Sequence, residues 1–246
     1  MIRATLAYVF IGIYVLLLGP IALLWNLATR DDELLYLLAR FCIRAAGLIC
    51  GVKVEVRGKE KIAPGVTYVF LSNHQSNFDG PALFHAIPRN CRALIKMEMM
   101  RLPILSLLMR RVGFVPIERL NPKQAQAGID LGAQRLSQGY SFIAFPEGTR
   151  SRSGQLGEFK KGPFVMAIKA QVPILPVTIV NSSTVQPPGR YSVVPGCIKV
   201  IFHEPISTAG LGLEDRYLLL QRARQAIASG LSLESGLSPG VRSARP

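Results

Sequence analysis

The chain has 246 residues, of which 49% are hydrophobic and 18% charged, and its 29 Lys and Arg against 15 Asp and Glu give a formal net charge of +14. So much apolar material excludes an intrinsically disordered chain. The glycines do not recur at a regular spacing, which excludes a collagen-like chain, and four cysteines are too few for a disulfide scaffold. The cysteines lack metal-ligand spacing, which indicates reduced thiols in apolar surroundings. Basicity combined with a mean hydropathy of +0.29 favours an anionic lipid surface as partner over nucleic acid.

The first segment carries no charge from Ala4 to Ala28. A helix of this length would be roughly 37 Å long, against a hydrocarbon core of about 30 Å. A cleaved signal peptide is the competing interpretation, but its apolar region is usually about 7–15 residues long and no A-x-A site follows here. Pro20 interrupts the run, so the choice between a spanning helix and one that lies in a single leaflet stays open.

The second segment, Leu34 to Ile49, places Arg40 and Arg44 on one face of an otherwise apolar helix. This narrow polar stripe is typical of an interfacial helix whose arginines reach the headgroups. The alternative is a core helix of a soluble domain. Residues 1–50 are therefore predicted to be membrane-anchoring helices, and the rest of the chain carries +13 of the +14.

Residues 51–229 are predicted to form one α/β domain, and residues 230–246 a flexible Gly/Ser/Pro/Arg-rich tail. Alternation of Val with charged residues over Val52–Arg57 predicts a half-buried strand. Further strands are predicted at Thr67–Leu71, Val112–Ile117, Phe142–Phe145, Ile174–Val180 and Ile198–Phe202, and helices near Pro81–Ala86, Pro103–Arg110, Lys123–Gln138, Gly162–Ala170 and Glu214–Ser229. This alternation predicts a mostly parallel or mixed β-sheet covered by helices on both faces. Residues 186–196 are expected to be a surface loop.

The strongest candidate site follows the second predicted strand, where His74 and Asp79 lie five positions apart. An extended chain would separate them by roughly 17 Å, so contact requires a tight bend. Asn73, Ser76 and Gly80 are residue types that favour such bends. If they meet, Asp79 can hold one ring nitrogen of His74 and leave the other as a base. The competing interpretation is that Asp79 caps a helix beginning near Pro81.

A second polar cluster, Glu147-Gly148-Thr149-Arg150, follows the strand predicted at Phe142–Phe145. The Arg150 guanidinium suits a phosphate, and Gly148 would let backbone amides approach an anion. A charged surface turn is the alternative. A third, scattered basic stretch runs from Arg89 to Lys123 and is expected by default to be a solvated face. His85 and His203 are predicted to be structural. The sequence contains no nucleophile elbow, phosphate-binding P-loop or dinucleotide-binding turn.

Taken in order, these blocks resemble the glycerolipid acyltransferases, most closely the bacterial 1-acyl-glycerol-3-phosphate acyltransferases. The H-x4-D block is similar to 73–79, the block that ends in arginine to 113–119, the third block to 145–151 and the fourth to 172–177. The resemblance covers about 72–180. It implies an α/β domain carried on an amino-terminal two-helix membrane motif, which in such relatives can rest in one leaflet.

The resemblance also implies roles for individual residues. His74 would be the general base and Asp79 its orienting carboxylate. Arg119 and Arg150, with Lys96, would hold the phosphate of the acceptor, and Glu147, Gly148 and Thr149 would shape that pocket.

The implied reaction moves an acyl group from acyl-CoA or acyl carrier protein to a lysophospholipid hydroxyl in phospholipid biosynthesis, with the acyl donor as co-substrate and no metal or other cofactor. The implied location is the inner membrane, with the catalytic domain on its cytoplasmic face. A lyso-ornithine lipid is an alternative acceptor. A membrane-tethered module that binds nucleic acid or anionic lipid is the rival of another class, but it leaves both polar clusters unexplained, so nucleic acid is not expected as a partner.

Overall fold

The computed structural model describes residues 1–101, 103–118 and 121–235. The helices are α1 Ile2–Thr29, α2 Glu33–Cys50, α3 Asp79–Ala86, α4 Pro103–Arg111, α5 Pro122–Ser137, α6 Gly162–Ala170, α7 Ser182–Val185 and α8 Arg216–Ser235. The strands are β1 Val52–Arg57, β2 Val69–Ser72, β3 Cys91–Lys96, β4 Val115–Ile117, β5 Ser141–Ala144, β6 Ile174–Val180 and β7 Gly196–Phe202. Short 3-10 helices lie at Lys59–Lys61, Met97–Arg101 and Leu213–Asp215.

The strands form one mixed sheet in the order β1-β7-β6-β2-β5-β3-β4, in which only the β6–β7 pair is antiparallel. This confirms the predicted α/β fold. Because β2, β5, β3 and β4 run in the same direction, their carboxyl ends meet at one edge of the sheet. Residues that follow β2 and β5 therefore lie on neighbouring strand ends, which is where α/β folds place their ligands.

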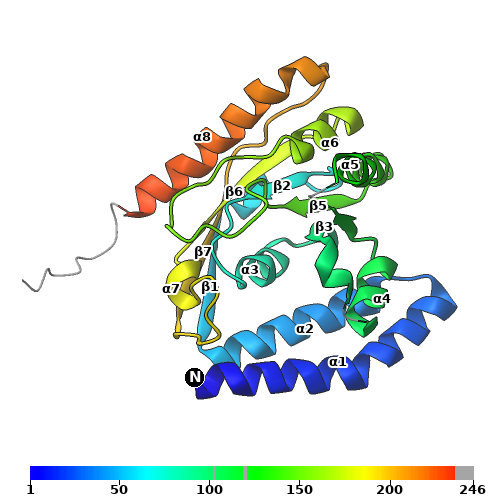
Figure 1. Ribbon diagram of the computed structural model, residues 1–246, viewed down its shortest axis with the longest axis vertical. Helices are drawn as coiled ribbons and strands as arrows, with labels where there is room; N and C mark the ends of the chain where they lie inside the picture. Colours follow the sequence, from blue (N-terminus) through cyan, green and yellow to red (C-terminus); the bar gives the residue numbers. More distant parts are fainter. Residues whose placement is uncertain (102, 119–120, 236–246) are drawn as a thin grey trace, which may run out of the picture.

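Helices cover both faces of the sheet (Figure 1). In β2 the side chain of Phe70 packs into the core under α3 and the hairpin of α1 and α2, whereas Val69 and Leu71 pack into the core under α5, α6 and α8. All three are fully buried. The centre of the sheet is apolar on both sides, as strands covered on two faces require.

The α1–α2 hairpin lies along one face of the domain and runs across its whole width (Figure 1). Helix α1 continues through Pro20 and is long and apolar enough to cross a membrane, although little of it is buried in the protein. Two polar side chains of α2 turn inward: Tyr36 donates to the Cys91 carbonyl at 2.8 Å and Arg40 to the Arg89 carbonyl at 2.7 Å. Arg44, the other arginine of the predicted stripe, is exposed. The prediction that Arg40 reaches toward lipid headgroups is therefore wrong, because its guanidinium satisfies carbonyl groups of the domain.

Large apolar side chains instead point away from the domain, on the outer face of the hairpin. These include Leu6, Val9, Ile13, Leu16, Leu17, Ile21 and Leu24 of α1 and Leu37, Phe41 and Leu48 of α2. This arrangement is the inverse of a soluble helix pair, which buries its apolar side and exposes its polar side.

Strand β3 was not predicted, because Arg92 and Lys96 give it the appearance of a solvated basic stretch. Arg92 is in fact buried, bonded to Asp32 at 2.8 Å and stacked over the Tyr140 ring at 3.8 Å. Strand β4 is shorter than predicted, because α4 runs to Arg111 and Gly113 turns the chain with φ of 81°.

Helix α8 also continues to Ser235, so residues 230–235, the first part of the predicted tail, are helical. Buried Glu234 anchors this end of α8 through an ion pair with Arg57 at 2.8 Å and another with Lys199 at 2.5 Å. Residues 236–246 lie outside the described residues.

Candidate active site

The loop after β2 turns sharply and brings His74 and Asp79 together. Nδ1 of His74 lies 2.8 Å from Oδ2 of Asp79, which confirms the predicted contact. The same oxygen accepts the backbone N–H of Gln75 at 2.6 Å and that of Ser76 at 2.7 Å. Three N–H donors thus converge on one buried carboxylate oxygen. An ionised carboxylate can only accept hydrogen bonds, so Nδ1 of His74 carries the proton and Nε2 is left as the basic nitrogen.

The alternative role of Asp79 as a helix cap does not hold. Helix α3 begins at Asp79 itself, and its preceding residue, Phe78, makes no side-chain cap bond. The donors to Asp79 come from residues upstream of α3, not from its first turn. The carboxylate therefore closes the turn around His74.

The amino-terminal end of this loop is fixed to the neighbouring strand. The Asn73 side chain donates to the Ile179 carbonyl and accepts from the Ile179 N–H, both at 2.8 Å. Phe145, at the end of β5, stacks on the His74 ring with a centroid separation of 4.1 Å and an interplanar angle of 16°. The stacking partner was missed by sequence reasoning, although its place directly before the Pro-Glu-Gly-Thr run was a usable signal.

Glu147 joins the two polar loops. Its Oε1 accepts the backbone N–H of His74 and its Oε2 that of Gly157, both at 2.8 Å. The side chain is buried, and burial raises the pKa of its carboxyl above the ordinary value, while the two N–H donors oppose that rise. A carboxylate held in this way positions backbone and would repel an anion, so it shapes the site without binding phosphate directly.

The residues after Glu147 form an open turn at the same edge. Gly148 adopts φ of 73°, and its N–H bonds to the Phe145 carbonyl at 3.0 Å. The N–H of Gly148 itself is therefore used within the turn. Thr149 is exposed, and Arg150 donates to the side-chain oxygen of Asn77. The guanidinium is thereby brought to the His74 loop.

Among the described residues, the predicted phosphate ligand Lys96 makes its ion pair outside the His74 loop. Lys96 ends β3 at the same sheet edge, two strands from β2, and its ammonium group pairs with Glu98 at 2.6 Å. Arg119 lies outside the described residues, after the end of β4. The structure brings His74, Asp79, Glu147 and Arg150 together and places Lys96 at the periphery.

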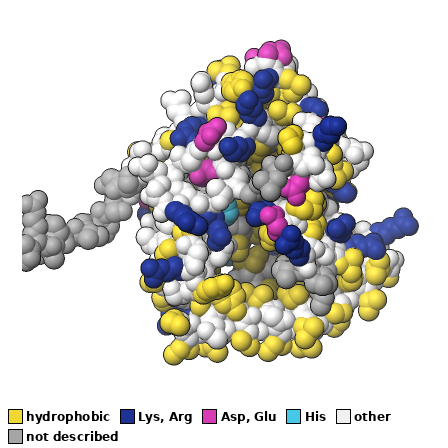
Figure 2. All heavy atoms as spheres, in the orientation of Figure 1, with side chains coloured by type: hydrophobic (Ala, Val, Ile, Leu, Met, Phe, Trp, Pro, Cys, Tyr) yellow, Lys and Arg dark blue, Asp and Glu magenta, His cyan; other side chains and the backbone are white. Residues whose placement is uncertain are grey.

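An apolar cavity of about 860 Å³ lies between the hairpin and the domain. Its walls come from α1, α2, α3 and α4, and Asn77 and Phe78 of the His74 loop form part of it. On one face of the molecule, Lys and Arg side chains surround a hollow in which a histidine is visible (Figure 2). The apolar cavity therefore adjoins a polar site with basic side chains around it, at the His74 loop.

The other two histidines differ in their surroundings, since His203 bonds to Thr178 and His85 lines the apolar cavity. His203 lies 2.7 Å from the Thr178 hydroxyl, and burial lowers its pKa to about 4. Burial also lowers the pKa of His85, with nearby Arg44 adding to the effect. Among the described residues, no group of three or more His, Cys, Asp or Glu could hold a metal ion.

The fold and site define the class: an α/β protein with a histidine–aspartate pair at the carboxyl edge of its sheet, beside an apolar cavity under an amino-terminal helical hairpin. The chain belongs to the Acyltransferase family, whose model matches residues 53–180.

Relatives at about a third identity support this assignment. The chain is 32% identical over 185 residues to the chloroplastic 1-acyl-sn-glycerol-3-phosphate acyltransferase BAT2 of Brassica napus, a match that covers 74% of this chain and 52% of that protein. It is 31% identical over 186 residues to the human 1-acyl-sn-glycerol-3-phosphate acyltransferase beta, covering 75% of this chain and 67% of the relative. The chain spans about half the length of the plant relatives it matches.

A solved structure is similar over nearly the full length. The crystal structure of the 1-acyl-sn-glycerophosphate acyltransferase PlsC from Thermotoga maritima superposes with a TM-score of 0.76 at 25% identity, covering 93% of this chain and 96% of that one. The similarity therefore extends beyond the residues matched by the family model.

Proposed function

We propose that this protein transfers an acyl group from acyl-CoA or acyl carrier protein to the free sn-2 hydroxyl of 1-acyl-glycerol-3-phosphate, giving phosphatidic acid. The observation that carries the proposal is the 2.8 Å bond between Nδ1 of His74 and Oδ2 of Asp79, which directs the basic Nε2 away from the carboxylate. The relatives named above act on this acceptor by their names, and the apolar cavity beside the loop suits a lipid substrate.

In the proposed reaction, Nε2 of His74 takes the proton from the acceptor hydroxyl as its oxygen attacks the thioester carbonyl. Asp79 stabilises the imidazolium that forms. The tetrahedral intermediate then collapses, the carbon–sulfur bond breaks, and the imidazolium returns the proton to the leaving thiolate. Both histidine and carboxylate end as they began, so the cycle requires no further cofactor. General-base assistance of this kind contributes on the order of 10²–10⁴ in rate.

Arg150 is the proposed ligand of the acceptor's phosphate, because its guanidinium lies at the His74 loop through Asn77. A planar guanidinium can bind two phosphate oxygens at once. Lys96 and Arg119 are proposed as outer contributors to the same charge. Glu147, Gly148 and Thr149 set the shape of the turn that presents Arg150.

The hairpin is proposed to hold the enzyme on the membrane. Its outward face carries large apolar side chains, and Tyr36 and Arg40 bond to the domain, so the outer face is suited to lipid. Since the whole hairpin lies flat along the domain, insertion into one leaflet would leave the cavity beside the bilayer. We propose the inner membrane, with the catalytic domain on the cytoplasmic face.

The first test is acyl transfer by the purified, full-length protein with labelled acyl-CoA and acyl carrier protein. His74→Ala is expected to lose about 10²–10⁴ in rate while remaining folded and bound to vesicles. Asp79→Asn should also lose activity, because a neutral amide oxygen in the place of Oδ2 cannot stabilise the imidazolium that forms on His74. Wild-type activity in His74→Ala would refute the mechanism.

The second test addresses the acceptor. Arg150→Ala should chiefly raise the KM for 1-acyl-glycerol-3-phosphate and leave the use of an uncharged monoacylglycerol unchanged. Arg152→Ala is the matched control, since this neighbouring arginine is exposed. Equal losses with both acceptors would contradict phosphate binding by Arg150, and preference for a lyso-ornithine lipid would replace the proposed acceptor.

A further inference from the structure

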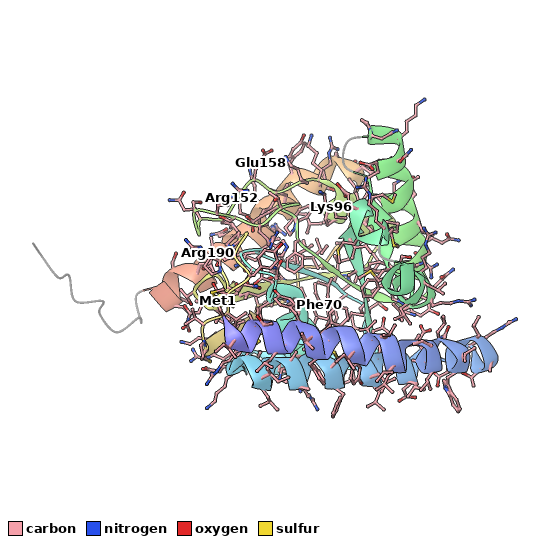
Figure 3. The ribbon with its side chains drawn as sticks, turned by 60° about the horizontal axis from the view of Figure 1, so that its bottom comes forward. Met1, Phe70, Lys96, Arg152, Glu158 and Arg190 are labelled. Atoms are coloured by element: carbon pink, nitrogen blue, oxygen red, sulfur yellow. The ribbon has the colours of Figure 1, made fainter. Side chains whose placement is uncertain are left out.

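The loop between α7 and β7, residues 186–195, lies beside the amino-terminal end of α1. In Figure 1 it is next to the chain's N-terminus, and Figure 3 labels Arg190 of the loop close to Met1. The loop thus lies at one end of the hairpin, on the side of the sheet opposite α8.

A hydrogen bond ties this loop to helix α1 of the hairpin. The buried Gln186 amide donates to the Tyr8 hydroxyl of α1 and to the Arg190 carbonyl, both at 3.0 Å. At its other end the loop leads into β7, whose first residue, Gly196, donates its N–H to the carbonyl of Gly51, the residue between α2 and β1, at 3.2 Å. The loop therefore has a set position relative to the hairpin.

The loop presents apolar side chains to the outside at that position. Tyr191 is 83% exposed and Val194 is 56% exposed, whereas Val193 between them is buried. A single exposed apolar side chain is ordinary on a soluble protein. Here, however, the same end of the hairpin also exposes Met1 at 91% and Leu48 at 80%.

Positive charge accompanies these apolar side chains. Arg190 is exposed in the loop, residues 186–195 contain no acidic residue, and Arg3 of α1 lies against Gly51 at the end of α2. Tyrosine prefers the membrane–water interface, and arginine near an anionic surface gains about 1 kcal/mol. Aromatic, aliphatic and cationic groups gathered at one end of the hairpin match the chemistry of the headgroup region of an anionic bilayer.

We infer that loop 186–195 is a third membrane-contact element, which places Tyr191 and Val194 at the headgroup level and Arg190 against lipid phosphates. The inference rests on the proposed membrane role of the hairpin. With contacts from two helices and a loop, the tilt of the domain is fixed and the cavity keeps a constant direction relative to the bilayer.

The test uses tryptophan fluorescence in the full-length protein. The only tryptophan, Trp25, is replaced by phenylalanine, and Tyr191→Trp is introduced in that background. Tyr217→Trp is the matched control, because Tyr217 is 48% exposed on α8, across the sheet from the hairpin. With vesicles of phosphatidylethanolamine and phosphatidylglycerol, Tyr191→Trp emission should shift to the blue and be quenched by brominated acyl chains, and Tyr217→Trp emission should stay unchanged.

A second pair of variants measures the contribution to binding. Tyr191→Ser with Val194→Ser should weaken vesicle partitioning about tenfold, because the apolar area that these side chains bury in the lipid, at roughly 25 cal/mol/Å², is lost. Tyr217→Ser with Leu218→Ser should not change it. Unshifted Tyr191→Trp emission in protein that sediments with vesicles would overturn the loop contact. Acyl transfer in detergent is measured in parallel: its absence, with quenching intact, would overturn the proposed function alone.

Discussion

Glu147→Gln separates a residue that positions the catalytic loop from one that contacts the acceptor. The native carboxylate accepts the N–H groups of His74 and Gly157, one on each oxygen. Glutamine has the same shape but only one oxygen, so its NH₂ group must face one of these N–H donors. One buried donor is then left without an acceptor, and the charge that strengthened the other bond is gone.

The size of the effect follows from those two bonds. A hydrogen bond to a charged group contributes about 1.5–3 kcal/mol, and a tenfold change in rate corresponds to about 1.4 kcal/mol. If the loss falls on the placement of the His74 loop, kcat should decrease about 10- to 100-fold. The KM for the acceptor should stay near its wild-type value, because the carboxylate does not touch the phosphate.

The assay is steady-state acyl transfer in detergent, with kcat and KM determined for both substrates. Glu158→Gln is the matched control: this nearby carboxylate is 86% exposed and should tolerate the change. The unfolding midpoint is recorded for each variant, so that lost activity is not confused with lost structure. Unchanged kcat with a raised acceptor KM would refute the positioning role.

Three further predictions concern the scaffold. Gly128→Ala should lower the free energy of unfolding by about 1–3 kcal/mol. Its new methyl group would lie 3.2 Å from the Pro116 carbonyl oxygen and 2.6 Å from the Ile117 side chain of β4. An unfolding midpoint equal to that of the wild type would contradict this close packing. The pKa of His203 is about 4 in the folded chain against 6.5 ordinarily, so stability should be complete above pH 6.5 and fall by about 2 kcal/mol as the pH decreases toward 4. His203→Asn should remove that loss of stability, as measured by urea unfolding at a series of pH values. If the variant loses stability at acid pH as the wild type does, His203 is not the cause. Arg40→Met should destabilise the packing of the hairpin on the domain by about 1–3 kcal/mol, because two backbone carbonyls lose their donor. The measurement is hydrogen exchange in α2, which should become faster. Exchange at the wild-type rate would show that the guanidinium does not hold the hairpin.

The His74–Asp79 contact could be predicted because it is local. Five residues and a bend-forming composition limit where the two side chains can lie, and the strand before them fixes the sheet edge. The same holds for the helices with clear periodicity and for the apolar first segment. Strand β3 could not be predicted, because its Arg92 is buried through Asp32 and Tyr140, residues remote in sequence.

The sequence by itself determined the α/β architecture, the apolar amino-terminal helices and the candidate catalytic pair, since periodicity, composition and short-range turns carry that information. Only the tertiary structure decided which face of α2 meets the domain, that Glu147 holds two loops together and that an apolar cavity is lined by Asn77 and Phe78 of the His74 loop. These features depend on where groups distant along the chain find hydrogen-bond partners, and a buried donor or acceptor takes whichever partner the packed fold brings near.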